Sequence, residues 1–96
     1  MIVLSVSLRV PPAELDALRP HIDVLVAASR AEPGCRVYTY AEDMQDPGLL
    51  RVFEVYDDDA ALEAHRRYPH FKAWRQMTDH YARVERRLYD AVLRPE

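Results

Sequence analysis

Hydrophobic and polar residues alternate along the first ten positions of the chain. One face of this segment carries Ile2, Leu4, Val6, Leu8 and Val10. A period of two in a segment rich in branched apolar side chains predicts a half-buried β-strand. The pair Pro11-Pro12 follows directly and is expected to end the strand.

Residues 13–32 change to the spacing of a helix. Their apolar positions recur three and four apart, at Leu15, Leu18, Ile22, Leu25 and Val26. Pro20 falls inside this stretch, where a proline removes a backbone hydrogen bond. Two interpretations therefore stay open: one kinked helix, or a short first turn followed by a new helix that starts at Pro20. The pair Pro33-Gly34 is expected to end the segment.

The middle of the chain predicts a β-hairpin. Residues 35–43 are the expected second strand, with Tyr38 and Tyr40 on one face, and residues 49–57 are the third. The sequence Gln-Asp-Pro-Gly at 45–48 is typical of the turn between two such strands.

The last part of the chain predicts helical segments and a final strand. The aspartates at 57–59 can accept hydrogen bonds at the start of a helix that contains His65. Tyr68-Pro69 is expected to break this helix, and a second short one follows with an apolar stripe of Phe71, Trp74 and Met77. The final strand is expected within residues 81–93, although apolar and polar residues alternate poorly there.

The resulting order is strand, helix, strand, strand, helix, strand, the split βαβ pattern of a ferredoxin-like α+β sandwich. We expect one domain over residues 1–96. The helices of this fold cover one face of the antiparallel sheet, so the other face needs apolar cover. A second copy of the same sheet would supply it, and a short domain with a thin core gains stability from a partner subunit. We therefore expect a homodimer.

Charge and composition exclude several classes of function. Asp and Glu number 16 against 13 Lys and Arg, a net charge of −3 that argues against a nucleic-acid-binding protein. The two glycines, Gly34 and Gly48, lie too far apart for a phosphate-binding loop. The single cysteine, Cys35, excludes an internal disulfide and a thiolate zinc site. No apolar run is long enough to span a membrane and the start lacks a basic segment, so we expect a cytoplasmic protein.

The candidate chemistry rests on histidines and aromatic residues. His65 and His70 are separated by an odd interval that contains Pro69, not by the helical spacing of paired metal ligands, so we expect no metal site. No nucleophile motif surrounds the serines, and Cys35 is expected to be a small buried hydrophobe. Aromatic residues fall close to both histidines and to Glu54 along the chain, which predicts an aromatic-walled small-molecule cavity.

Two strings along the chain carry a more specific signal. The first, residues 29–38, reads Ser-Arg-Ala-Glu-Pro-Gly-Cys-Arg-Val-Tyr. The second combines Glu54-Val55-Tyr56, Ala61-Leu62-Glu63-Ala64-His65 and Pro69-His70-Phe71. Together they resemble the signature of the antibiotic biosynthesis monooxygenase domain family, in which a helix ending in Ser-Arg-x-Glu-x-Gly runs into a strand that bears a tyrosine. The order and spacing of the segments match over essentially the whole chain.

The first string has a structural interpretation. Arg30 and Glu32 flank the end of the predicted helix, and Gly34 is expected to supply the positive φ of its C′ cap. Arg30 is expected to pair with Glu54 on a neighbouring strand, which would tie the helix end to the sheet.

The resemblance implies a dimeric α/β barrel, in which two ferredoxin-like units pack their sheets face to face and each last strand reaches the neighbour. Described activities of the family include oxidation of phenols to quinones without a cofactor, haem degradation, and reactions of small carbonyl compounds that involve no oxidation. The haem-degrading members resemble this chain less well. Their pocket asparagine is replaced here by Ser5 or Ser7, and their haem-ligating histidine by Arg75. Haem degradation is therefore not expected.

The expected function is oxidation of a small phenolic or hydroquinone-type substrate to a quinone by O2, without a cofactor. Because no flavin, haem or metal motif is present, the electrons must come from the substrate anion, and the protein must remove a proton. His65 is the expected base, with His70 second. The residues expected to bind the ring are Tyr38 and Trp74, which orient and stack it, and Phe71 and Tyr56, which line the wall. The alternative is a protein of the same fold that binds or isomerises a small molecule without oxidation.

Overall fold

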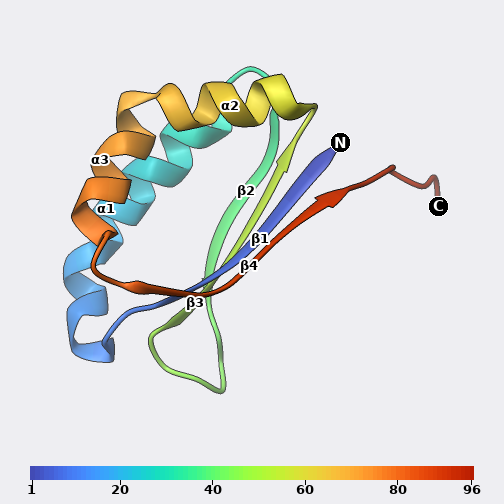
Figure 1. The fold of residues 1–96 in the computed structure, drawn as a ribbon. Helices are drawn as coiled ribbons and strands as arrows, with labels where there is room; N and C mark the ends of the chain where they lie inside the picture. The colour runs from blue at the N-terminus through green and yellow to red at the C-terminus, as the bar shows by residue number, and fades with distance from the viewer.

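The computed structural model describes residues 1–96 and confirms the predicted order of strands and helices. The elements are β1 (Ile2–Arg9), α1 (Pro12–Arg30), β2 (Cys35–Glu42), β3 (Leu49–Tyr56), α2 (Asp59–Arg67), α3 (Pro69–Thr78) and β4 (Ala82–Asp90). The four-stranded sheet forms one layer and the three helices lie together on one of its faces (Figure 1). This arrangement is the ferredoxin-like α+β fold that the order of elements predicted.

The sheet has the strand order β2-β3-β1-β4, and all neighbouring strands are antiparallel. β1 therefore lies in the interior of the sheet, where Val6 is opposite both Val52 and Arg86. The alternation along β1 correctly predicted its buried face, because successive side chains of a strand point to opposite sides. The buried residues of that face are Ile2, Leu4, Val6 and Leu8.

A single helix, α1, runs through Pro20, so the interpretation in which a new helix starts at this proline is wrong. Pro20 lies on the exposed face of α1, as does Asp16, whose carbonyl loses its usual N–H partner. Water can satisfy that carbonyl at the surface, which explains why the helix tolerates the proline. No helix of the structure, α1 included, has both the length and the apolar character needed to cross a lipid bilayer.

Two groups of buried apolar side chains hold the layers together. The larger packs α1 and α3 against the sheet and contains Leu8, Val10, Leu15, Leu18, Leu25, Tyr38, Leu50 and Trp74. The smaller packs α2 against the sheet and contains Ile2, Leu4, Val6, Val52, Tyr56 and Leu62. The candidate site lies where these two groups meet, because members of both line the same cleft.

The turns around α1 and α2 follow the predictions in part. The carboxylate of Asp58 accepts a hydrogen bond from the backbone N–H of Ala61 at 2.9 Å and caps α2, as predicted. Gly34 has a φ of +82°, but α1 already ends at Arg30, so the predicted C′ cap is wrong and this glycine shapes the turn into β2. Its carbonyl accepts a hydrogen bond from the N–H of Asp57 at 2.8 Å, which ties the turn to the segment before α2.

The predicted ion pair between Arg30 and Glu54 is also wrong. Arg30 Nε donates a hydrogen bond to the carbonyl of Tyr38 at 3.0 Å, and this bond ties the end of α1 to β2. Glu54 lies on the buried face of β3, where its carboxylate accepts a hydrogen bond from the hydroxyl of Tyr56 at 2.5 Å. The carboxylate therefore faces the interior between the layers and not the helix end.

A β-bulge in β4 explains the poor alternation of residues 81–93. Val6 lies opposite Arg86 and Leu8 lies opposite Arg83, so β4 has one more residue than β1 over this interval. Both arginines consequently share the face of the sheet that the helices cover. In a regular strand, residues three positions apart point to opposite faces.

The other face of the sheet has no cover within the chain (Figure 1). Apolar side chains on it remain partly open to solvent: Val37 is 38% exposed, Phe53 is 45% exposed and Tyr89 is 47% exposed. This is the face for which the sequence predicted a partner.

Candidate functional site

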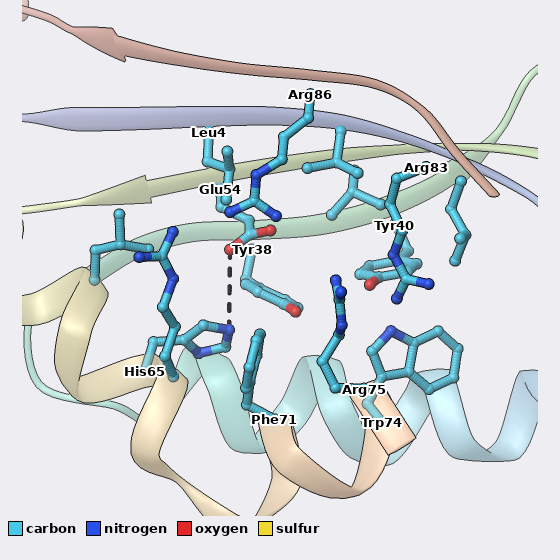
Figure 2. A pocket seen from close by; sticks show the side chains of 15 residues that line it. Leu4, Tyr38, Tyr40, Glu54, His65, Phe71, Trp74, Arg75, Arg83 and Arg86 are labelled. Carbon is cyan, nitrogen blue, oxygen red and sulfur yellow. Dashed lines mark ion pairs between the residues drawn. The ribbon is translucent and has the colours of Figure 1, made fainter. Parts of the chain in front are cut away.

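A cleft lies between the helical layer and the sheet, with α2 and α3 on one side and the strands on the other (Figure 2). Its volume is about 40 Å³, which is room for a few water molecules. Four of the predicted site residues line it: Tyr38, His65, Phe71 and Trp74. The other two, Tyr56 and His70, do not line it. Tyr56 contacts the lining residue Glu54, and His70 contacts Glu32 and lines a separate hollow between α1 and α3.

His65, on α2, is held rigidly at the inner end of the cleft. It is 1% exposed, and its Nδ1 lies 2.8 Å from Oε2 of Glu32. Three aromatic rings surround the imidazole, with centroid distances of 5.3 Å to Tyr38, 5.4 Å to Tyr56 and 5.0 Å to Phe71. The ring is therefore fixed both by a hydrogen bond and by packing.

Glu32 joins the two histidines, although the sequence analysis gave it only a structural place near the helix end. It is buried, and the oxygen that contacts His65 also lies 2.6 Å from Nε2 of His70. A carboxylate oxygen accepts hydrogen bonds, so each imidazole donates a ring N–H to it. The Ser-Arg-x-Glu string was the signal for this residue, but nothing in the string showed that its glutamate turns inward.

The second ring nitrogen of His65 has no hydrogen-bond partner. Nε2 is buried and unpaired, and the nearest carboxylate oxygen, Oε1 of Glu54, lies 3.9 Å away (dashed line in Figure 2). Because the N–H sits on Nδ1, the lone pair of a neutral His65 sits on Nε2, where it can accept a proton. A buried polar atom without a partner is uncommon in folded proteins, so this nitrogen calls for an explanation.

Glu54 gives the inner end of the cleft a second titratable group. Burial raises the pKa of Glu54, and the hydrogen bond from Tyr56 opposes that rise in part. Burial and the neighbouring Glu54 together raise the pKa of Tyr56, which therefore remains a neutral hydrogen-bond donor. The carboxyl of Glu54 is thus easier to protonate than a carboxyl on the surface.

Tyr38, Tyr40 and Trp74 form an aromatic wall along the cleft. The ring of Tyr40 meets Trp74 edge-on at 5.7 Å and lies 5.9 Å from Tyr38. Burial raises the pKa of both tyrosines, so both remain neutral. Tyr40 was predicted to share a face with Tyr38 but was not among the predicted site residues. The wall presents flat rings, which suit an aromatic ligand.

Cys35 takes no part in the cleft. It packs partly buried beside both core groups. Burial and the nearby Glu32 raise the pKa of this thiol to about 11. The thiol is therefore protonated near neutral pH and is a poor nucleophile.

Glu32, His65 and His70 are also the residues that could hold a metal ion. Their donor atoms lie within 4.8 Å of one another. The spacing argument gave no reason to expect this cluster, because His70 follows a break in the helix and Glu32 comes from a distant segment. Both histidines already bond to one oxygen of Glu32, so a zinc ion would have to replace both of these hydrogen bonds.

Four arginines also line the cleft, and the sequence analysis did not single them out as a group. They are Arg66 on α2, Arg75 on α3, and Arg83 and Arg86 on β4. Figure 2 shows Arg75, Arg83 and Arg86 extending into the space between the helices and the strands. One histidine and four cations therefore line the same cleft.

Comparison with known proteins places this chain among related sequences and folds. A family model described as antibiotic biosynthesis monooxygenase matches residues 1–77, which contain all of the cleft residues except those on β4. Rv0793 from Mycobacterium tuberculosis is 41% identical over 64 residues, which cover 67% of this chain and 62% of Rv0793. YcnE from Bacillus subtilis is 30% identical over 74 residues, which cover 77% of this chain and 78% of YcnE. The match to Rv0793 thus spans less than two thirds of that relative.

Solved structures share the fold along almost the full chain. The structure of Rv0793 superposes with a TM-score of 0.80 at 28% identity and covers 98% of this chain and 96% of that one. The crystal structure of an antibiotic biosynthesis monooxygenase superposes with a TM-score of 0.83 at 28% identity, over 97% of this chain and 100% of that one.

Proposed function

This chain belongs to the antibiotic biosynthesis monooxygenase family, and from that premise we propose that it oxidises a small phenolic or hydroquinone-type substrate to a quinone with O2 and without a cofactor. One observation carries the proposal. His65 presents an unpaired Nε2 at the end of an aromatic cleft while Glu32 holds its Nδ1. This is the arrangement of an oriented general base.

The first step of the proposed reaction is removal of the substrate hydroxyl proton by Nε2 of His65. A phenol with a pKa near 10 is about 0.1% ionised at pH 7, and lowering that pKa by about three units takes roughly 4 kcal/mol of selective stabilisation of the anion. Glu32 stabilises the imidazolium that forms, because its carboxylate contacts Nδ1. His70 donates to the same oxygen and holds Glu32 in place, so we assign His70 a positioning role.

The second step is oxidation of the substrate anion by O2. The anion gives one electron to O2, and the resulting radical and superoxide combine at the ring carbon para to the oxygen to form a peroxide. The peroxide O–O bond then breaks as that carbon loses its hydrogen as a proton, which leaves a quinone and water. For a naphthol the balance is one naphthol and one O2 to one quinone and one H2O. A hydroquinone already carries the second oxygen, so after proton removal it gives two electrons to O2, and one hydroquinone and one O2 yield one quinone and one H2O2. Neither reaction needs an outside reductant.

The cleft must widen to admit a ring, because its volume is about 40 Å³. Three arginine side chains of its wall can move to widen it. Arg66 and Arg75 are partly exposed and Arg86 is exposed, so these long side chains can swing outward without breaking the core. Tyr38 and Trp74 would then flank the ring, while Phe71 and the buried Tyr56 keep the imidazole in position.

The experiment that tests this function is aerobic incubation with naphthols and hydroquinones under 18O2, after dialysis against a metal chelator. The expected result is protein-dependent quinone formation, with uptake of one O2 per naphthol and one 18O atom in the quinone. Quinone formation at the same rate without the protein would indicate autoxidation and would overturn the proposal, as would naphthol-derived quinone that contains no 18O. Tight binding of naphthols without oxygen uptake would favour the alternative, a binding or isomerising protein of the same fold.

We also propose that two copies pair through their uncovered sheet faces to form a dimeric barrel. The exposed apolar side chains of that face, Val37 and Phe53 among them, support the proposal because they need cover. Phe53→Lys is expected to weaken dimerisation at least tenfold in sedimentation equilibrium. Val24→Lys is the matched control, since Val24 is also exposed but lies on α1. A monomer in the unaltered protein at micromolar concentration would contradict the proposal.

A further inference from the structure

The cleft concentrates positive charge in a chain whose net charge is negative. Four arginines line it against a single acidic residue, Glu54, although the whole chain carries a net charge of −3. A generally basic protein would show such a cluster by chance, but this one has fewer cations than anions. The arginines are therefore placed at the cleft by the fold and not by composition.

The β-bulge in β4 is what brings two of these arginines together. Arg83 pairs with Leu8 and Arg86 pairs with Val6, both of which line the cleft. Without the extra residue at the bulge, one of the two guanidinium groups would point to the opposite face of the sheet. Bulges commonly serve to aim a side chain at a site.

Neither arginine of β4 forms an ion pair with an acidic side chain. Arg83 donates hydrogen bonds to the carbonyls of Thr78 and Tyr81, at 2.5 and 3.2 Å, and to the hydroxyl of Thr78 at 2.9 Å. These neutral acceptors fix the guanidinium and leave its charge in place. The guanidinium of Arg86 has no hydrogen bond or ion pair, and Figure 2 shows it on the sheet side of the cleft, pointing toward Glu54, whose pKa its charge lowers in part.

The other two arginines differ, because each has an acidic neighbour. Arg66 contacts Glu63 at 2.8 Å and Arg75 contacts Asp79 at 3.9 Å. Burial and the nearby Arg75 lower the pKa of Arg83, and Asp79 opposes this shift in part. The unsatisfied charge of the cleft is thus concentrated on β4.

We propose that Arg83 and Arg86 bind a carboxylate group of the substrate, so that the preferred substrate is a hydroxyaromatic carboxylate whose hydroxyl points to His65. A guanidinium presents parallel N–H donors that match the two oxygens of a carboxylate. The hydroxyl end then meets the base at the inner end of the cleft, and the ring lies along the aromatic wall. This inference rests on the proposed function for the role of His65, but the carboxylate site itself does not depend on turnover.

Anaerobic calorimetry with a matched pair of ligands, 6-hydroxy-2-naphthoate and its methyl ester, tests the proposal separately from catalysis. The acid is expected to bind at least about tenfold more tightly than the ester, and this advantage should shrink as salt is added. Arg86→Gln should weaken binding of the acid far more than binding of the ester. Arg87→Gln is the matched control, because Arg87 pairs with Glu85 at 3.4 Å and lies opposite Ser5, on the other face of the sheet.

Equal binding of the acid and the ester, or no binding of either, would overturn the carboxylate site. An equal loss of the advantage in Arg87→Gln and Arg86→Gln would also overturn it, since that result indicates a general effect of charge. If the acid is preferred but neither ligand supports oxygen uptake, the proposed oxygenase function fails and the carboxylate site stands. If neutral naphthols are oxidised and the acid binds no more tightly than the ester, the oxygenase function stands and the carboxylate site fails.

Discussion

Nδ1 of His65 lies 2.8 Å from Oε2 of Glu32, although 33 positions separate the two residues. The contact joins the last turn of α2 to the turn that follows α1. It fixes which ring nitrogen carries the proton and leaves the other nitrogen facing the cleft. The proposed chemistry depends on this contact.

Replacing His65 removes the proposed base. His65→Ala is expected to lower kcat for naphthol oxidation by about 10²-fold or more, the usual contribution of a positioned general base. Oxygen uptake measured with an electrode checks this expectation. His80→Ala is the matched control, because His80 is exposed and lies outside the cleft. A His65→Ala protein that folds normally and retains its activity would exclude His65 as the base.

Replacing Glu32 tests its role as a positioning residue. Glu32→Gln retains the size of the side chain but loses the negative charge beside Nδ1 of His65, so kcat is expected to fall by about tenfold or more while KM changes little. Steady-state kinetics across several substrate concentrations separate the two constants. A rise in KM with unchanged kcat would instead indicate that Glu32 shapes the binding site.

The stability of the protein should depend on the protonation of Glu54. Burial raises its pKa above the ordinary value of 4.5, so the folded protein holds this proton more tightly than the unfolded chain does. Its contribution to stability is therefore complete below pH 4.5 and is lost as the pH rises through the raised folded-state value. Urea unfolding between pH 4 and 8 should show a smaller decline for Glu54→Gln than for the unaltered protein. The exposed Glu63→Gln is the control, and identical slopes in all three proteins would contradict the expectation.

The turn at Gly34 should tolerate no side chain. Its φ is +82°, and a Cβ there would lie 2.8 Å from Cβ of Ala61. Gly34→Ala is expected to lower the free energy of unfolding by about 1–3 kcal/mol, from backbone strain together with the contact to α2. Chemical denaturation measures this loss. In combination with Ala61→Gly, the loss from Gly34→Ala should become smaller, and strict additivity would show that the steric contact contributes nothing.

The strands and helices of the fold could be predicted from local sequence patterns. The period of two in β1 and the helical spacing in α1 depend on which side chains face the core, and neighbouring residues display that information directly. The cap at Asp58 and the break at Tyr68 depend on backbone chemistry within a few residues. The continuity of α1 through Pro20 was not decidable in this way, because it depends on whether the freed carbonyl meets water or protein.

Part of the cleft lining could also be predicted from the sequence. Four residues that were expected there line it: Tyr38, His65, Phe71 and Trp74. Tyr56 and His70 were also expected there, but neither lines the cleft. Glu32 was assigned to the helix end, because a sequence pattern does not show that a residue beyond the helix turns inward. The sequence did not show that Arg83 and Arg86 share one face of the sheet. They do so because of the bulge between them, and no sequence pattern predicted that bulge.

The order of residues was therefore sufficient to establish the α+β architecture, the faces of β1 and α1, and the family to which the chain belongs. The partners of the histidines and the convergence of the arginines were decided by how distant segments pack. Hydrophobic periodicity repeats over a few residues, so one segment reveals it. A hydrogen bond between α2 and the turn after α1, or a shared face across a bulge, exists only once the helices lie on the sheet.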